Sequence, residues 1–242
     1  MRNLYLSAAF IFFISFMQGN PLYASGQQYS AFLITAGDSA ASGNCPPFVD
    51  YAGRKYKTVQ IGSQCWFMEN LSVGKMINSS LDPSDDSEIE MYCYNNRENN
   101  CEKYGALYQW SEAMQYRTVA SGKQMTNVNF RQGICPEGWH IPSLEDFREL
   151  DSLVKGEANK LKLPGVVIGA VGDNASGFSA LVKGYRDADG TFKGIAYRTL
   201  FWSSDEYSET KASNLYLQSR ENTLQYFVNR KTYGFHVRCL RD

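Results

Sequence analysis

Hydrophobic and polar residues alternate along residues 48–71, "FVDYAGRKYKTVQIGSQCWFMENL", and this alternation predicts β-strands. The pattern runs on both sides of Ala52 and Gly53, a dipeptide that favours a turn. We therefore expect the two strands of a hairpin here. Its expected packing residues are Tyr51, Tyr56, Val59, Ile61 and Trp66.

A second region of alternation begins after residue 165 and continues to the end of the chain. It contains a hairpin-like turn at residues 187–190, where Asp and Gly are concentrated. Further along, "NLYLQSRENTLQYFVNRKTYGFHVRCLRD" alternates over three runs joined near residues 221–222 and 231–234. We expect strands separated by turns throughout this region.

A helical spacing of apolar residues occurs in two places between these regions. In "GALYQWSEAMQY", Leu107, Trp110 and Met114 recur at intervals of three and four, which predicts a short helix over residues 106–116. Helices followed by strands indicate an α+β fold with a mainly antiparallel sheet.

The second helical signal, "PSLEDFRELDSLVKG", carries its own start and stop. Ser143 is the expected N-cap, Asp146 lies three residues later as in a capping box, and Gly156 is the expected end. One side of this helix is expected to be apolar, through Leu144, Phe147, Leu150 and Val154.

Residues 72–100 are polar and rich in turn-forming residues, and we expect them to form a surface loop. Cys93 and Cys101 bracket "YNNRENN", which contains too few apolar residues to hold its own shape. A disulfide between these two cysteines is therefore expected. The charged stretch "DPSDDSEIE" is expected to be solvated rather than to bind a cation.

The N-terminus has the layout of a secretory signal peptide. Arg2 precedes an apolar run over residues 4–17, and small residues follow near Ser25. The run has about 14 residues, fewer than the roughly 20 of a membrane-spanning helix. We expect cleavage after residue 24, a flexible segment over residues 25–44, and no stable membrane insertion. No cysteine near this junction offers a site for lipid attachment, so soluble export is expected.

Composition narrows the partners and the compartment. A net charge of −1 provides no field that would attract nucleic acid. All six cysteines lie in the exported part, and an even number in an oxidising compartment predicts three disulfides, among 15 possible pairings. Structural zinc is not expected, because the closest pair, Cys93 and Cys101, is eight positions apart.

Six motifs occur in an order that resembles the Fibrobacter succinogenes major paralogous domain, a family of exported bacterial proteins. They are "YKTVQIGSQCWFMENL", "GALYQWSEAM", "QGICPEGWHIPS", "NASGFSALVKGYR", "FWSSDE" and "YGFHVRCLRD", within residues 45–242. The resemblance implies a C-type-lectin-like fold, related in architecture to formylglycine-generating enzymes. Such a fold has two helices packed on a curved, mainly antiparallel sheet with its first and last strands adjacent. Disulfides staple it, and long loops carry any binding site.

The same resemblance implies how the last strand is held. In this fold class the end of the chain is tied back to its middle, which implies a disulfide between Cys135 and Cys239. Cys45 and Cys65, at the edges of the N-terminal hairpin, then pair by elimination. The alternative for Cys135 is a reactive thiol, activated by His140 and by the helix that begins at Ser143.

The two histidines, His140 and His236, flank the expected Cys135–Cys239 bridge. Together they offer a metal two ligands, but no acidic residue is aligned as a third, so we expect packed or hydrogen-bonded histidines. Trp139 is expected to fill the core beneath the capped helix.

A ligand site is predicted at "LFWSSDEYSE". Trp202 offers a flat apolar face for stacking, and Ser204, Asp205 and Glu206 offer polar groups beside it. The alternative is that Phe201 and Trp202 close the core before a loop. Tyrosines along the strands have the same ambiguity between core and binding face. They are Tyr185, Tyr197, Tyr207, Tyr216, Tyr226 and Tyr233.

A calcium ion is the cofactor for which the sequence contains a candidate binding motif. "YRDADGTF" places Asp187, Asp189 and Gly190 as in the first part of a calcium loop, but the third acid and the distant glutamate are missing. A plain Asp-Gly hairpin turn is the alternative. The calcium-coordinating motifs of sugar-binding C-type lectins are absent from the sequence, so sugar binding of that kind is not expected.

These observations favour a non-enzymatic exported binding module of the bacterial cell envelope. We expect it to work in the periplasm, on the outer surface or as a secreted protein, and to recognise a glycan or a cell-surface protein. One alternative is an enzyme or enzyme accessory related to formylglycine-generating proteins, in which a cysteine pair acts on substrate or binds copper. Another is a structural subunit of a surface assembly.

Overall fold

The computed structural model describes residues 45–117, 131–164 and 171–242. The expected signal peptide and the segment over residues 25–44 lie outside the described residues. Among the described helices, none is long and apolar enough to span a membrane. The helices are α1 (Glu98–Tyr104), α2 (Trp110–Ala113) and α4 (Leu144–Leu153), with 3-10 turns η1 (Tyr94–Asn96) and η2 (Ala158–Leu161).

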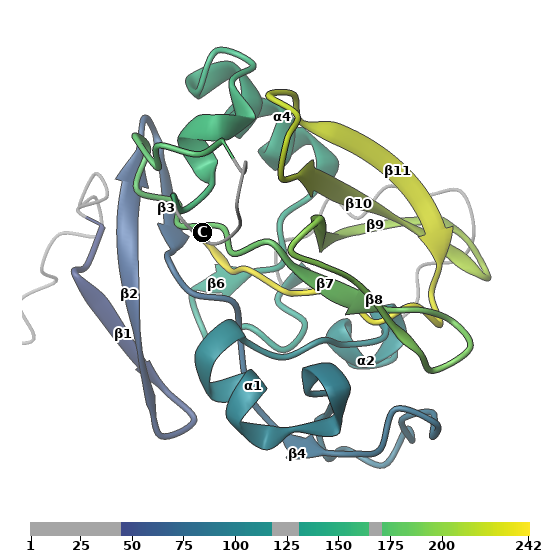
Figure 1. Ribbon diagram of the computed structural model, residues 1–242. Helices are drawn as coiled ribbons and strands as arrows, with labels where there is room; N and C mark the ends of the chain where they lie inside the picture. Colours follow the sequence, from purple (N-terminus) through teal and green to yellow (C-terminus); the bar gives the residue numbers. More distant parts are fainter. Residues whose placement is uncertain (1–44, 118–130, 165–170) are drawn as a thin grey trace, which may run out of the picture. The chain divides into compact units, whose positions relative to one another are not determined.

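Two five-stranded sheets form the body of the domain, together with a parallel pair, β4–β5 (Figure 1). The first sheet has the order β1-β2-β3-β12-β6 and the second β11-β10-β9-β7-β8. Within these two sheets, only the β7–β9 pairing is parallel. The α+β class with mainly antiparallel strands is confirmed, but the strands divide into two sheets where one curved sheet was expected. The strands are β1 (Phe48–Tyr51), β2 (Arg54–Ile61), β3 (Gln64–Phe67), β4 (Lys75–Met76), β5 (Glu90–Met91), β6 (Trp139–His140), β7 (Lys183–Arg186), β8 (Phe192–Ile195), β9 (Arg198–Ser208), β10 (Lys211–Gln218), β11 (Gln225–Arg230) and β12 (Leu240–Arg241).

The chain over residues 234–241, which we call the C-terminal segment, joins the two sheets. On one side, the amide of Trp202 donates to the carbonyl of His236, whose own amide donates to Leu200, each at 3.0 Å. On the other side, the amide of Phe67 donates to the carbonyl of Cys239 at 3.0 Å. The last strand, β12, therefore pairs with β3 and β6, and not with the first strand as expected.

The N-terminal hairpin forms as its sequence predicts. Ala52 and Gly53 have φ values of 48° and 75°, the left-handed conformations that a tight two-residue hairpin turn requires. The alternation continues through a second turn into β3, so this region contributes three strands instead of two.

Helix α4 begins with the predicted capping box. The Ser143 side chain accepts a hydrogen bond from the amide of Asp146, and the Asp146 carboxylate accepts from the amide of Ser143. Phe147 and Leu150 are buried, and Phe147 stacks on Trp66 with ring centroids 5.6 Å apart. Trp66 is therefore the tryptophan beneath this helix.

Trp139 was expected in that position, and this prediction is wrong. Its ring contacts Phe67 instead, at a centroid distance of 4.6 Å, in a second hydrophobic cluster. Trp139 lies on β6, at the edge of the first sheet, so its side chain meets β3 and not the helix. The residue is part of the core, as expected, but of a different part.

Two predictions between residues 72 and 116 also need correction. Helix α1 forms where only surface loop was expected, and its Cys101 is buried in a disulfide with Cys93. The helix expected over residues 106–116 is shorter, because Leu107 exchanges backbone hydrogen bonds with Tyr92 in an extended conformation. Local periodicity did not reveal this pairing, since its partner lies 15 positions earlier in the chain.

All six cysteines form disulfides, in the three pairs expected from the sequence: Cys45–Cys65, Cys93–Cys101 and Cys135–Cys239. The last pair spans 104 positions and fastens the C-terminal segment to the residues that precede α4.

The C-terminal segment also carries a buried cation, Arg238. Its guanidinium donates to the carbonyl of Phe178 and, at 2.5 Å, to the side-chain oxygen of Asn70. It lies over the Phe178 ring, 4.4 Å from the centroid. Burial lowers the pKa of Arg238 to about 9, and the carboxylate of Glu69 opposes that shift. The group is charged at neutral pH.

We expect removal of the Cys135–Cys239 disulfide to destabilise the protein more than removal of Cys93–Cys101. In the chain-entropy model the longer loop is worth about 4.7 kcal/mol and the shorter loop about 2.6 kcal/mol. The two double Cys→Ala variants can be compared by denaturant unfolding without reductant. Equal losses would mean that the C-terminal segment is held by its other contacts.

A second prediction concerns His236, which is buried and has a pKa lowered to about 4 by burial. An unfolded histidine titrates near 6.5, so between these values the unfolded state binds a proton that the folded state does not. Stability is present above pH 6.5 and is lost as the pH falls toward 4. From pH 7 to pH 5 the free energy of unfolding should fall by about 2 kcal/mol through this group.

The variant His236→Gln keeps a donor for the carbonyl of Ala106, which lies 2.9 Å from the imidazole Nδ1. Urea unfolding at both pH values should show a smaller loss in this variant than in the parent protein. Groups such as Glu69 titrate in both proteins, so the difference isolates His236. An identical loss in both proteins would contradict the assignment.

Candidate functional site

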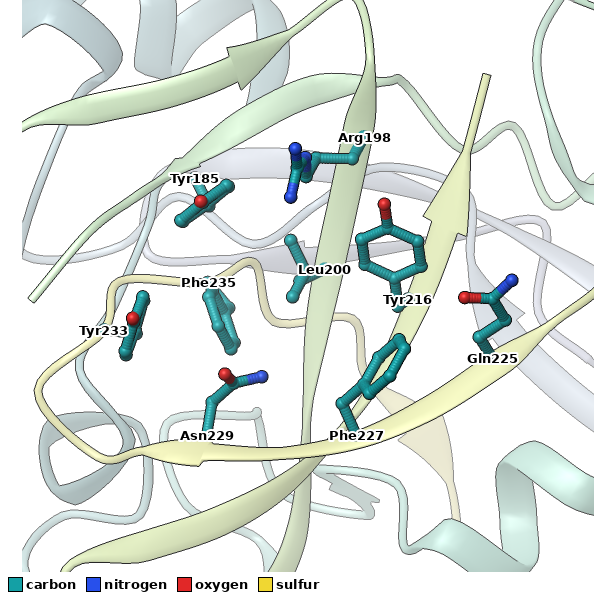
Figure 2. A pocket seen from close by; sticks show the side chains of 9 residues that line it. All are labelled: Tyr185, Arg198, Leu200, Tyr216, Gln225, Phe227, Asn229, Tyr233 and Phe235. Carbon is teal, nitrogen blue, oxygen red and sulfur yellow. The ribbon is translucent and has the colours of Figure 1, made fainter. Parts of the chain in front are cut away.

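A pocket of about 250 Å³ opens on one face of the second sheet (Figure 2). Its walls come from four strands, β7, β9, β10 and β11, and from the chain just after β11. The residues that line this aromatic pocket are Tyr185, Arg198, Leu200, Tyr216, Gln225, Phe227, Asn229, Tyr233 and Phe235.

The two-residue period of a strand explains why these side chains meet. Gln225, Phe227 and Asn229 are alternate residues of β11, so they project from the same face. Antiparallel pairing sets Tyr216 of β10 opposite Gln225 on one side and opposite Leu200 of β9 on the other. The intervening residues project to the opposite face, which packs toward α4.

Aromatic rings form the walls and the floor of the pocket. Tyr216 and Phe227 meet edge to face with centroids 5.3 Å apart, and 47% of Phe227 is exposed. Tyr185 and Tyr233 both contact the buried Phe235, at 5.9 and 5.6 Å. Figure 2 shows these rings arranged around the open space above Leu200. The cavity therefore presents several flat apolar faces to a ligand.

Polar groups without intramolecular partners lie among these rings. Within the described part of the chain, the side chains of Gln225 and Asn229 make no hydrogen bond, and neither does the hydroxyl of Tyr185. Arg198 is half-buried, and its guanidinium lies 5.8 Å from the centroid of the Tyr185 ring. Both donors and acceptors are available to a bound molecule.

Two pocket tyrosines, Tyr216 and Tyr233, have a raised pKa and are neutral at physiological pH. Burial raises the pKa of Tyr216, and Arg198 opposes that shift. Burial also raises the pKa of Tyr233, as does the nearby carboxylate of Asp187. The hydroxyl of Tyr216 donates to the side-chain oxygen of Gln218 at 2.8 Å, so its lone pairs remain available as acceptors.

The ligand site predicted around Trp202 is not a surface site, and this expectation is corrected. Trp202 is completely buried, contacts Phe235 at 4.2 Å and donates its indole N–H to the carbonyl of Tyr108 at 2.8 Å. Phe201 and Trp202 instead lie in the core, as the alternative interpretation of this motif predicts. Ser204 is buried as well.

Asp205 and Glu206 have structural partners in place of a ligand. The Asp205 carboxylate accepts from the amide of Leu144, in the first turn of α4, where negative charge is stabilising. Glu206 forms an ion pair with Lys231, and both side chains are largely buried. None of the four residues of this prediction lines the pocket, and Trp202 contacts one lining residue, Phe235.

Asp187 and Asp189, the candidate calcium ligands, lie in a turn, as the alternative interpretation of this motif predicts. The Asp189 carboxylate accepts from the amide of Thr191 at 2.9 Å, which closes the turn between β7 and β8. Lys193 places its ammonium against Asp187 and, at 3.8 Å, near Asp189. Across residues 45–117, 131–164 and 171–242, no cluster of three or more His, Cys, Asp or Glu side chains has a metal-binding arrangement.

Both histidines are buried and hydrogen-bonded. His140 Nδ1 lies 2.6 Å from a carboxylate oxygen of Asp242, and its Nε2 lies 3.5 Å from one of Asp146. His236 binds the carbonyl of Ala106, as described above. Cys135, the candidate nucleophile, is in a disulfide.

Three of the six strand tyrosines line the pocket: Tyr185, Tyr216 and Tyr233. Tyr197 and Tyr207 are exposed elsewhere, and Tyr226 donates to the carbonyl of Phe147 on the opposite face. Sequence reasoning missed Arg198, Gln225, Phe227 and Asn229. The period-two spacing of the last three could have shown that they share one face of a strand. The sequence does not show that this face would be concave.

Comparison with known proteins gives one match. The model of the family described as the Fibrobacter succinogenes major domain matches residues 59–241, which is most of the chain. No curated protein and no solved structure matches the chain.

The corrected role of Trp202 can be tested by the variant Trp202→Phe. It removes the indole donor, so that the Tyr108 carbonyl keeps only its hydrogen bond from the amide of Phe235, and it leaves a small void in the core. The free energy of unfolding should therefore fall by about 2 kcal/mol. The control Tyr207→Phe, at a residue 68% exposed on the same strand, should change it by less than about 0.5 kcal/mol. Unchanged stability in Trp202→Phe would contradict the structural role.

Proposed function

The chain belongs to the Fibrobacter succinogenes major domain family, and we propose that it is an exported, non-enzymatic binding module of the bacterial cell envelope that recognises a glycan. The observation that carries the proposal is the aromatic pocket, in which exposed rings and unpartnered polar groups share one small cavity. Apolar rings suit the C–H faces of a sugar, while amide and hydroxyl groups suit its hydroxyls.

The size of the pocket favours a short ligand. Pockets for drug-sized molecules usually enclose roughly 300–1,000 Å³, and this one encloses about 250 Å³. We propose that a single sugar ring, at the end of a chain or as a branch, enters the cavity. Neighbouring sugars of the same glycan would lie along β11.

Binding rather than catalysis is proposed because of the state of the cysteines. The competing enzyme hypothesis requires a cysteine pair that acts on substrate or binds copper. All six cysteines are in disulfides, and Cys135 and Cys239 are both buried. Three disulfides also support the proposed export, since such bonds persist in oxidising compartments.

We further propose that the fold is C-type-lectin-like. Strand β12, at the C-terminus, pairs with β3 of the N-terminal region, and a disulfide ties the end of the chain to its middle. The disulfide is a feature that the family resemblance implies for that fold, and β12 meets the N-terminal region through β3 instead of through the first strand.

The proposed function predicts glycan binding that depends on the pocket rings. On an array of neutral and acidic oligosaccharides, the purified protein should bind at least one glycan. Tyr216→Ala and Phe227→Ala should each weaken that binding by about 10-fold or more, because buried aromatic contacts dominate small interfaces. Calorimetric titration of the best ligand measures the effect.

Tyr207→Ala is the matched control, since Tyr207 is an exposed tyrosine of β9 outside the pocket. Its affinity should equal that of the parent protein. Titration with EDTA should also give the same affinity, because Lys193 already neutralises Asp187 and Asp189. Glycan binding that survives both pocket variants, or no glycan binding at all, would refute the proposal.

A further inference from the structure

We infer that the aromatic pocket selects an acidic sugar, whose carboxylate pairs with the guanidinium of Arg198. This inference rests on the proposed function and specifies the ligand class of the same site. Uronic acids are sugars of this chemistry: they carry one carboxylate on a ring that is otherwise covered by hydroxyl and C–H groups.

Among the described residues, Arg198 is the one charged residue that lines the pocket. It lies at the start of β9, and its side chain projects between Tyr185 and Tyr216 (Figure 2). The guanidinium lies over the Tyr185 ring, 5.8 Å from its centroid, within the range of a cation–π contact. A planar guanidinium matches the two oxygens of a carboxylate in a bidentate pair.

Apart from the Tyr185 ring, the positive charge of Arg198 has no anionic or hydrogen-bonding partner among the described residues. Within residues 45–117, 131–164 and 171–242 it forms no ion pair and no hydrogen bond, and its Nε is buried without an acceptor. A half-buried cation without an acceptor is costly, and a bound anion would remove that cost. The pocket is therefore complementary to a negative group.

The rest of the pocket favours a sugar over an acidic peptide. An Asp or Glu side chain would satisfy Arg198, but it has no ring to cover Tyr216 and Phe227, which meet at 5.3 Å. It would also leave the amides of Gln225 and Asn229 without partners. A uronic acid supplies a carboxylate, an apolar ring face and hydroxyls together.

The test compares acidic and neutral versions of one glycan. Oligomers of galacturonate, glucuronate, mannuronate and guluronate are titrated into the full-length mature protein, each beside its methyl ester, which keeps the ring but removes the charge. We expect the best uronate to bind about 10- to 100-fold more tightly than its ester, because a hydrogen bond to a charged group contributes that much.

Arg198→Gln should remove this preference, so that the uronate and its ester bind the variant with affinities within about twofold of each other. Arg198→Lys keeps the positive charge but loses the planar pair of donors that binds both carboxylate oxygens, so it should retain part of the preference. Arg230→Gln is the matched control, because Arg230 is an exposed arginine at the end of β11 that does not line the pocket. It should behave as the parent protein does, and thermal melting checks that each variant is folded.

Three results would overturn the inference, and they are distinguishable. Equal binding of uronates and esters, lost in Phe227→Ala, would refute the acidic ligand while the proposed function stands. Uronate binding that Arg198→Gln leaves intact would show that a residue other than Arg198 binds the carboxylate of the ligand. Binding of poly-glutamate but of no sugar would refute both the acidic-sugar inference and the proposed function.

Discussion

The fold depends on the burial of the C-terminal segment between two sheets. Backbone groups removed from water must find partners inside the protein, and this segment finds them on both flanks, with β9 through His236 and with β3 through Cys239. Arg238 adds a cation to the same interior, held by Phe178 and Asn70. Each sheet therefore has this segment as a neighbour in the folded protein.

This constraint also builds the candidate site. Tyr233, just before the C-terminal segment, and Phe235, within it, form one wall and the floor of the pocket. Phe235 is fixed by backbone hydrogen bonds in both directions with Tyr108 and by its contact with Trp202. Rings held in this way lose little freedom when a ligand binds, and such preorganisation favours affinity. Trp202, first suspected of binding, therefore contributes by supporting Phe235, which does line the cavity.

What could be predicted from the sequence follows from the range of each interaction. The capping box of Ser143 and the Ala52–Gly53 turn are local, and both form as predicted. Helix α1 and the place of Trp202 depend on partners far along the chain, so no local pattern reveals them. Alternation predicts that β11 has two faces, but which face is concave depends on the pairing of β9, β10 and β11. The pocket is visible only once that register is known.

Arg198 differs from the buried cations of the same domain. Four Lys and Arg side chains are buried in the described residues, and each has oxygen partners: Arg186 donates to Ser79, Lys162 to Gln218, Lys231 to Glu206, and Arg238 to Phe178. These partners are backbone carbonyls or a carboxylate within the chain. Arg198 has aromatic neighbours, and among the described residues it has no oxygen partner of either kind. These four buried cations, which stabilise the fold, all have oxygen partners within the chain. The absence of such a partner for Arg198, in a cavity of aromatic rings, is explained if a ligand supplies the oxygen.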